Sequence, residues 1–181
     1  ESGKDFSLRA SLIENRRAVL ESKSGLYTAK MEQTACIEGV NAGDCSGKRN
    51  AIWTITQRDK TEVTASSAMG QLLAGGDFAL NAASLDLGNA ASLAGGANVT
   101  LGAGNLLVNR GRITAAGDLV ASAASLNNYG TLGGGGNLRL NAPALLNERG
   151  LLFSGADMTL RAGDITNLYG DVYSLGRLDI A

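Results

Sequence analysis

Acidic and amide side chains recur at a fixed interval along the chain, most of them directly after a glycine or an alanine. From Asp77 onward the interval is 19 to 21 residues. The column comprises Asp5, Asp77, Asn98, Asp118, Asn137 and Asp157, and Arg177 takes the next position. Aligned carboxylates could bind calcium or act in acid–base cleavage of a polysaccharide. Asn replaces Asp freely here, however, and both residues suit tight turns. We therefore interpret this set as a turn column.

Other reactive residues are few. The chain has no histidine, which excludes a histidine-based triad and the usual imidazole metal site. Cys36 and Cys45 are separated by eight residues, a spacing that fits neither a CxxC redox motif nor a zinc site. A disulfide between them is the simpler interpretation. It would indicate an oxidising compartment, and no metal or cofactor is expected.

The turn column belongs to a repeat that covers most of the chain. Its units start at Leu72, Leu93, Ile113, Leu132, Leu152 and Val172. Apolar residues follow mostly six and eight positions later, and alanine ten positions later. The column thirteen positions later comprises Leu85, Leu106, Leu126, Leu145 and Ile165. Positions six, eight and ten alternate with outward residues, which indicates β-strand. Glycine with Asp or Asn supplies the corners.

Short strands and corners repeating every 20 residues describe a solenoid in which each coil buries its apolar face against its neighbours. We predict an all-β fold, a right-handed parallel β-helix; the hand follows the general preference of parallel crossovers. A second corner carries asparagines fifteen positions after each start, which could form amide ladders. They are Asn15, Asn128, Asn147 and Asn167, while Leu87 and Val108 take the same column.

The repeat is absent between Ser22 and about Ala68. The segments 26–36 and 51–63 are rich in Thr, β-branched or aromatic residues, which predicts an antiparallel hairpin outside the helix. The predicted organisation is coil over 1–22, inserted hairpin over 23–68 and coils over 69–181. Two interpretations of the hairpin remain open: a decoration that binds nothing, or a recognition element. For the latter the candidate side chains are Tyr27, Trp53, Arg49 and Arg58.

Charge and hydropathy exclude some partners. The formal net charge is −1, and no basic excess favours nucleic acid. The uncharged stretch 66–76 is too polar to span a membrane. The chain opens and ends within the repeat and shows no cap at either end. We therefore expect it to be a piece of a longer rod.

Some of the repeats look familiar. The segments Gln71-Leu72-Leu73-Ala74-Gly75-Gly76-Asp77-Phe78 and Arg112-Ile113-Thr114-Ala115-Ala116-Gly117-Asp118-Leu119 resemble the repeats of the filamentous haemagglutinin family. That family includes the exoproteins of two-partner secretion and the CdiA effectors of contact-dependent growth inhibition. The resemblance covers residues 1–22 and about 70–181.

The resemblance implies export through an outer-membrane transporter partner and display, as a virulence factor, on a Gram-negative cell surface. There the rod would present adhesive regions or a toxin to a target-cell receptor or a host glycan. We expect a structural and adhesive segment, not an enzyme, and the choice between adhesin and growth-inhibition effector stays open. The alternative is a carbohydrate-active β-helix enzyme similar to polysaccharide lyases.

Overall fold

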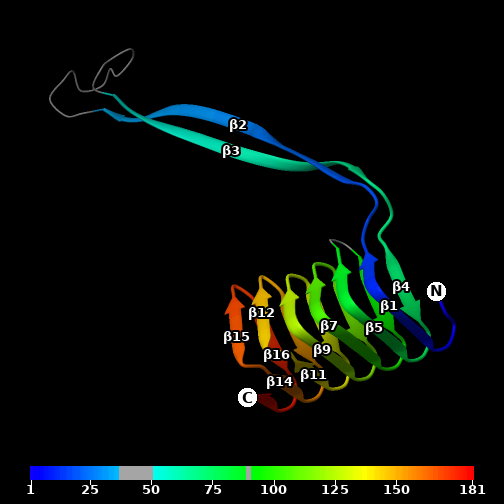
Figure 1. Ribbon diagram of the computed structural model, residues 1–181. Helices are drawn as coiled ribbons and strands as arrows, with labels where there is room; N and C mark the ends of the chain where they lie inside the picture. Colours follow the sequence, from blue (N-terminus) through cyan, green and yellow to red (C-terminus); the bar gives the residue numbers. More distant parts are fainter. Residues whose placement is uncertain (37–50, 89–90) are drawn as a thin grey trace. The chain divides into compact units, whose positions relative to one another are not determined.

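The computed structural model describes residues 1–36, 51–88 and 91–181 (Figure 1). The chain divides into two compact units. The first, here called the rod, consists of Glu1–Ala18 and Ser67–Ala181, and the second, the hairpin, is Val19–Ser66. The sequence placed these boundaries at 22/23 and 68/69. Leu20, which the predicted boundary assigned to the coil over 1–22, pairs with Ser66 of β3 instead.

The rod is built from two parallel sheets. Among the described residues, one sheet contains nine strands: β1 (Phe6–Asn15), β5 (Phe78–Leu87), β7 (Val99–Asn109), β9 (Leu119–Asn128), β11 (Leu138–Asn141), β12 (Ala144–Glu148), β14 (Met158–Arg161), β15 (Asp164–Leu168) and β17 (Leu178–Ile180). The other contains six: β4 (Gln71–Ala74), β6 (Ser92–Gly95), β8 (Arg112–Ala115), β10 (Thr131–Gly134), β13 (Leu151–Ser154) and β16 (Asp171–Ser174).

A coil contributes one strand to the six-stranded sheet and one strand or a pair of strands to the nine-stranded sheet. A four-residue strand such as β4 is followed by a Gly-Gly-Asp turn and then by a long bent strand such as β5. In the later coils the long strand is divided in two, at Pro143 and at Gly163. Proline lacks the N–H that a continuous ladder requires, which accounts for the first division. All pairings in the two sheets are parallel, so the predicted right-handed parallel β-helix is confirmed.

The core is a narrow stack of aligned apolar side chains. Position six of successive coils pairs in register, and all of its interior members are buried: Phe78, Val99, Leu119, Leu138 and Met158. The rings of Phe6 and Phe78 stack across two coils with centroids 4.9 Å apart. Alanine at position ten is buried in the interior coils, at Ala103, Ala123 and Ala142. The neighbouring coil therefore supplies most of the burial of every core residue.

One core prediction is wrong by a single residue. Leu106, assigned to the apolar column, is 37% exposed, and Leu107 is completely buried in its place. Leu107 pairs with Leu85 and Leu126 in the neighbouring coils. The cause is a bulge: the register shifts between Ala103 and Leu106, where β7 has one residue more than β9. Such an extra residue moves every following side chain to the opposite face.

The hairpin comprises β2 (Leu20–Cys36) and β3 (Ala51–Ser66), paired antiparallel with three register shifts. It confirms the predicted hairpin insertion in an otherwise parallel fold. Its described side chains include three exposed apolar residues, Leu26, Ile55 and Val63. Over the described part of the chain no helix is long and apolar enough to cross a membrane.

The bulge yields a matched pair of variants. We expect Leu107→Ala to lower the free energy of unfolding by about 2–5 kcal/mol, because it leaves a cavity in the core. Leu106→Ala should change it by about 0.5 kcal/mol or less, because that side chain is partly solvated. Urea-induced unfolding followed by circular dichroism measures both. Equal losses, or a larger loss for Leu106→Ala, would contradict the observed register.

Candidate functional site

The turn column forms a ladder along the rod. In each coil a side-chain Oδ1 accepts a hydrogen bond from the backbone N–H of the equivalent residue in the next coil. The N···O distances are 2.9 Å for Asp77 to Asp5, 3.0 Å for Asn98 to Asp77, 3.0 Å for Asp118 to Asn98, 2.8 Å for Asn137 to Asp118, 3.2 Å for Asp157 to Asn137 and 2.8 Å for Arg177 to Asp157. Only an oxygen acceptor is required, so Asp and Asn serve equally well.

The acids of this column accept the hydrogen bonds of the ladder, and from Asp77 to Asp157 they alternate with amides. Asp118 accepts from both the backbone and the side chain of Asn137, and its Oδ2 lies 3.5 Å from a guanidinium nitrogen of Arg139. These hydrogen bonds, led by the one from the Asn137 backbone, hold the pKa of Asp118 below its usual value. Among the described residues no group of three or more acidic or cysteine side chains could hold a metal ion.

A second ladder lies inside the rod. The Nδ2 of Asn109 donates to Oδ1 of Asn128, Asn128 donates to Asn147, and Asn147 donates to Asn167, each at 2.7 Å. The second N–H of each amide reaches a backbone carbonyl at the corner, such as Thr131 O at 2.8 Å from Asn109. Every rung is therefore satisfied as both donor and acceptor, as a buried amide requires.

The prediction that Val108 belongs to this column is wrong, for the same reason as Leu106. The bulge in β7 brings Asn109 into register with Leu87 and Asn128. Counting residues from the unit start could not reveal this shift. Aligning the triplet Asn109-Arg110-Gly111 with Asn128-Tyr129-Gly130 would have identified Asn109. Leu87 interrupts the ladder between Asn15 and Asn109.

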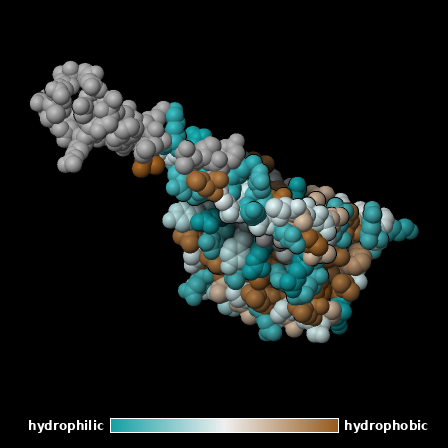
Figure 2. Space-filling model, turned by 90° about the horizontal axis from the view of Figure 1, so that it is seen from above, coloured by the Kyte–Doolittle hydropathy of each residue, from teal (hydrophilic) through white to brown (hydrophobic). Residues whose placement is uncertain are grey.

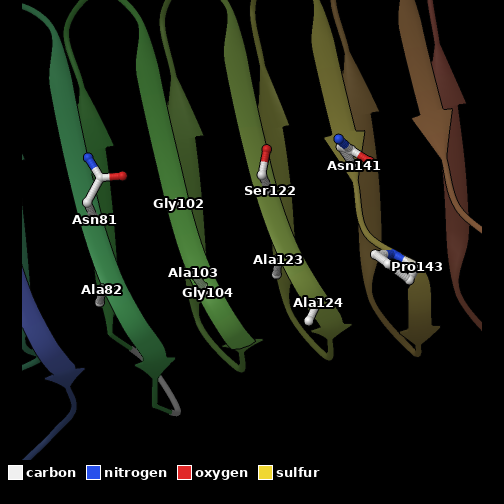
Figure 3. Close-up of a pocket in the computed structure, with 10 residues that line it drawn as sticks. All are labelled: Asn81, Ala82, Gly102, Ala103, Gly104, Ser122, Ala123, Ala124, Asn141 and Pro143. Carbon is white, nitrogen blue, oxygen red and sulfur yellow. The ribbon is translucent and has the colours of Figure 1, made fainter.

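A shallow groove of about 540 Å³ follows the bend of the larger sheet across several coils. Figure 3 shows Asn81, Ser122 and Asn141 projecting from β5, β9 and β11 along it. Small residues, among them Gly104, Ala124 and Pro143, line the rest. The three polar side chains are exposed, and none is hydrogen bonded to another described residue. This groove could not be predicted from the repeat, because residues of several coils line it.

The structure describes only part of the candidate recognition set. Arg58 is an exposed residue of β3. Tyr27 and Trp53 belong to β2 and β3 by their backbone, but their side chains lie outside the described residues, as does all of Arg49. Cys36 ends β2 and Cys45 lies outside the described residues, so their pairing stays a prediction.

Comparison with known proteins gives one family. The family model for the haemagglutinin repeat matches residues 1–35, 64–147 and 133–181. The matched segments include every coil of the rod, and on both sides they extend into the hairpin. No curated protein and no solved structure matches the chain.

The buried ladder predicts a position-specific loss of stability. Asn128→Ala removes the acceptor of Asn109 and the donor to Asn147, so we expect the free energy of unfolding to fall by about 1–3 kcal/mol or more. Asn81→Ala is the control, because Asn81 is exposed in the groove and has no partner. Urea-induced unfolding measures both variants. A loss for Asn81→Ala as large as that for Asn128→Ala would contradict the role of the ladder.

The turn ladder predicts a pH dependence. Because folding depresses the pKa of Asp118, this residue stabilises the fold above its unfolded pKa of about 4 and loses that contribution as the pH falls through the folded value. Asp118→Asn keeps the acceptor and should reduce the acid-induced drop in thermal midpoint between about pH 6 and pH 2. Asp118→Ala should lower the midpoint at both. An unchanged acid response in Asp118→Asn would argue against this contribution.

Proposed function

Because the chain belongs to the haemagglutinin repeat family, we propose that it is a segment of a secreted filament that projects adhesive or effector regions from a bacterial surface. The family is structural and adhesive, and it is not an enzyme family. A filament segment needs length and stiffness more than a reaction centre. The stacked coils of the rod provide both.

The observation that carries this proposal is the register between coils. Aligned parallel strands connect each coil to the next through backbone hydrogen bonds, and two side-chain ladders run in the same direction. A coil cannot bend away from its neighbour without breaking several of these bonds together. On the face seen in Figure 2, hydrophilic and apolar residues are interspersed over the rod, as suits an exposed structural surface.

The family also supports a proposed secretion route. Haemagglutinin repeat proteins are typically substrates of two-partner secretion, which supports export through an outer-membrane transporter partner. A strand-rich rod of short local coils suits this route, because each coil can fold onto the previous one as it emerges. Both an adhesin and a CdiA-like growth-inhibition effector would use such a rod as a stalk.

The hairpin is the proposed recognition element. Ile55 and Val63 lie eight positions apart on β3 and so share a face. Leu26 lies on the same face because it pairs with Asp59, an even number of positions from both. All three side chains are more than half exposed. Exposed apolar residues on one face of a ribbon are typical of a binding surface, and insertions in solenoids commonly carry recognition.

The test replaces the whole hairpin, residues 19–66, with a short Gly-Ser linker. The join is short because Leu20 pairs with Ser66. We expect the labelled variant to lose binding to target cells, while the thermal midpoint of the rod stays close to that of the parent protein. A second variant, Ile55→Thr with Val63→Thr, keeps the hairpin and should weaken cell binding. Undiminished binding by the linker variant would reject the hairpin as the recognition element.

A further inference from the structure

A cleft of about 480 Å³ lies at the second corner of the rod, away from the turn column. It is lined by Met69, Gln71, Ala91, Ser92, Arg110, Gly111 and Arg112. Two of these residues are arginines, and none is acidic. Its size is within the range of small-ligand pockets. Neither the fold nor the two ladders gives this cleft a function.

Three of its side chains form a row of unused donors. Gln71, Ser92 and Arg112 pair in register on β4, β6 and β8, so they stand one coil apart on the same wall. None of the three side chains makes a hydrogen bond or an ion pair with another described residue. Adjacent parallel strands are about 4.8 Å apart. The amide of Gln71, the hydroxyl of Ser92 and the guanidinium of Arg112 therefore lie side by side and are available to a ligand in the cleft.

Arg110 supplies a second cation in a fixed position. Its Nη1 donates to Oδ1 of Asp86 at 3.2 Å, and its guanidinium carbon lies 5.3 Å from the ring centroid of Tyr129. The ion pair uses one nitrogen and leaves other N–H groups for a ligand. Both restraints come from residues outside the cleft lining, so the guanidinium is oriented before any ligand binds.

The corner that carries both arginines is rigid. Gly111 N–H donates to Oδ1 of Asn109 at 3.1 Å, which ties the corner to the buried amide ladder. A Cβ on Gly111 would lie 2.2 Å from the carbonyl oxygen of Ala91, so only glycine allows this approach of the two coils. Arg112 N–H then donates to the same carbonyl at 2.9 Å. Preorganised guanidinium groups bind carboxylate and sulfate oxygens well.

We propose that this cleft binds the single anionic group, a carboxylate or a sulfate, of a saccharide unit. The two guanidinium groups take the anion, and the Gln71 and Ser92 side chains donate to it or to neighbouring hydroxyls. Met69 and Ala91 provide an apolar wall for the sugar ring. Arg110 shares its charge with Asp86, so the local positive charge is small, and the net charge of the chain is −1. Both facts disfavour polyanions such as nucleic acid. The choice of a saccharide rests on the proposed surface filament, whereas the anion site does not.

Isothermal titration of the purified full chain tests the proposal with four probes: glucuronate, glucose 6-sulfate, neutral glucose and inorganic sulfate. We expect the two acidic sugars to bind, more tightly than inorganic sulfate, and neutral glucose not to bind. Arg112→Gln should weaken their binding about tenfold or more, since a charge-assisted hydrogen bond is lost. Arg110→Gln should act in the same direction. The matched control is Arg139→Gln, an exposed arginine on the other sheet, which should bind as the parent does.

Several results would overturn the proposal. Equal affinities for glucose and glucuronate would show that the cleft does not recognise the anionic group. Inorganic sulfate binding as tightly as the acidic sugars would show that the cleft does not recognise the saccharide. Binding unchanged in both Arg112→Gln and Arg110→Gln would exclude the cleft. These measurements use no cells. The anion site can therefore be rejected while hairpin-dependent cell binding persists, and the hairpin can be rejected while the cleft still binds acidic sugars.

Discussion

The parallel pairing of each coil with the next is the interaction on which the rest of this structure depends. A single coil has too few residues to bury its own apolar side chains, so Leu101 or Leu119 is removed from water only when neighbours stack on both sides. The backbone hydrogen bonds between coils set a separation of about 4.8 Å. At that separation equivalent residues of successive coils touch. The columns of the sequence are the consequence of this spacing.

The two polar columns differ because one is buried and the other is exposed. A buried rung must satisfy both neighbours, so it needs a donor and an acceptor, and the amide of Asn128 has both. A carboxylate at that position would lack the donor and would bring an uncompensated charge into the core. A turn rung needs only an acceptor for a backbone N–H, so Asp118 and Asn137 alternate there without conflict. Burial therefore decides which column can contain acids.

The sequence was sufficient for the features that repeat. Periodicity alone predicted the β-helix, the corners and most of the core, because the same pattern of residue types recurs in every coil. It was insufficient where one coil differs from the others. The extra residue in β7 displaced Leu107 and Asn109 from the positions that counting assigned to Leu106 and Val108. Leu20 was misplaced because the antiparallel pairing at the base of the hairpin competes with the coil pattern.

The grooves and clefts could not be predicted from the sequence, for a different reason. Each is lined by residues of several coils, and its shape depends on which side chains are small or bent at one corner. Gly102 leaves space over which the Asn81 side chain extends, and Gly111 lets two coils approach at the corner between Arg110 and Arg112. Neither glycine stands out in the repeat. Because identical coils present identical surfaces, departures from the repeat are the only places where the rod can distinguish one ligand from another. Specificity in a solenoid of this kind should therefore be sought at its irregular residues.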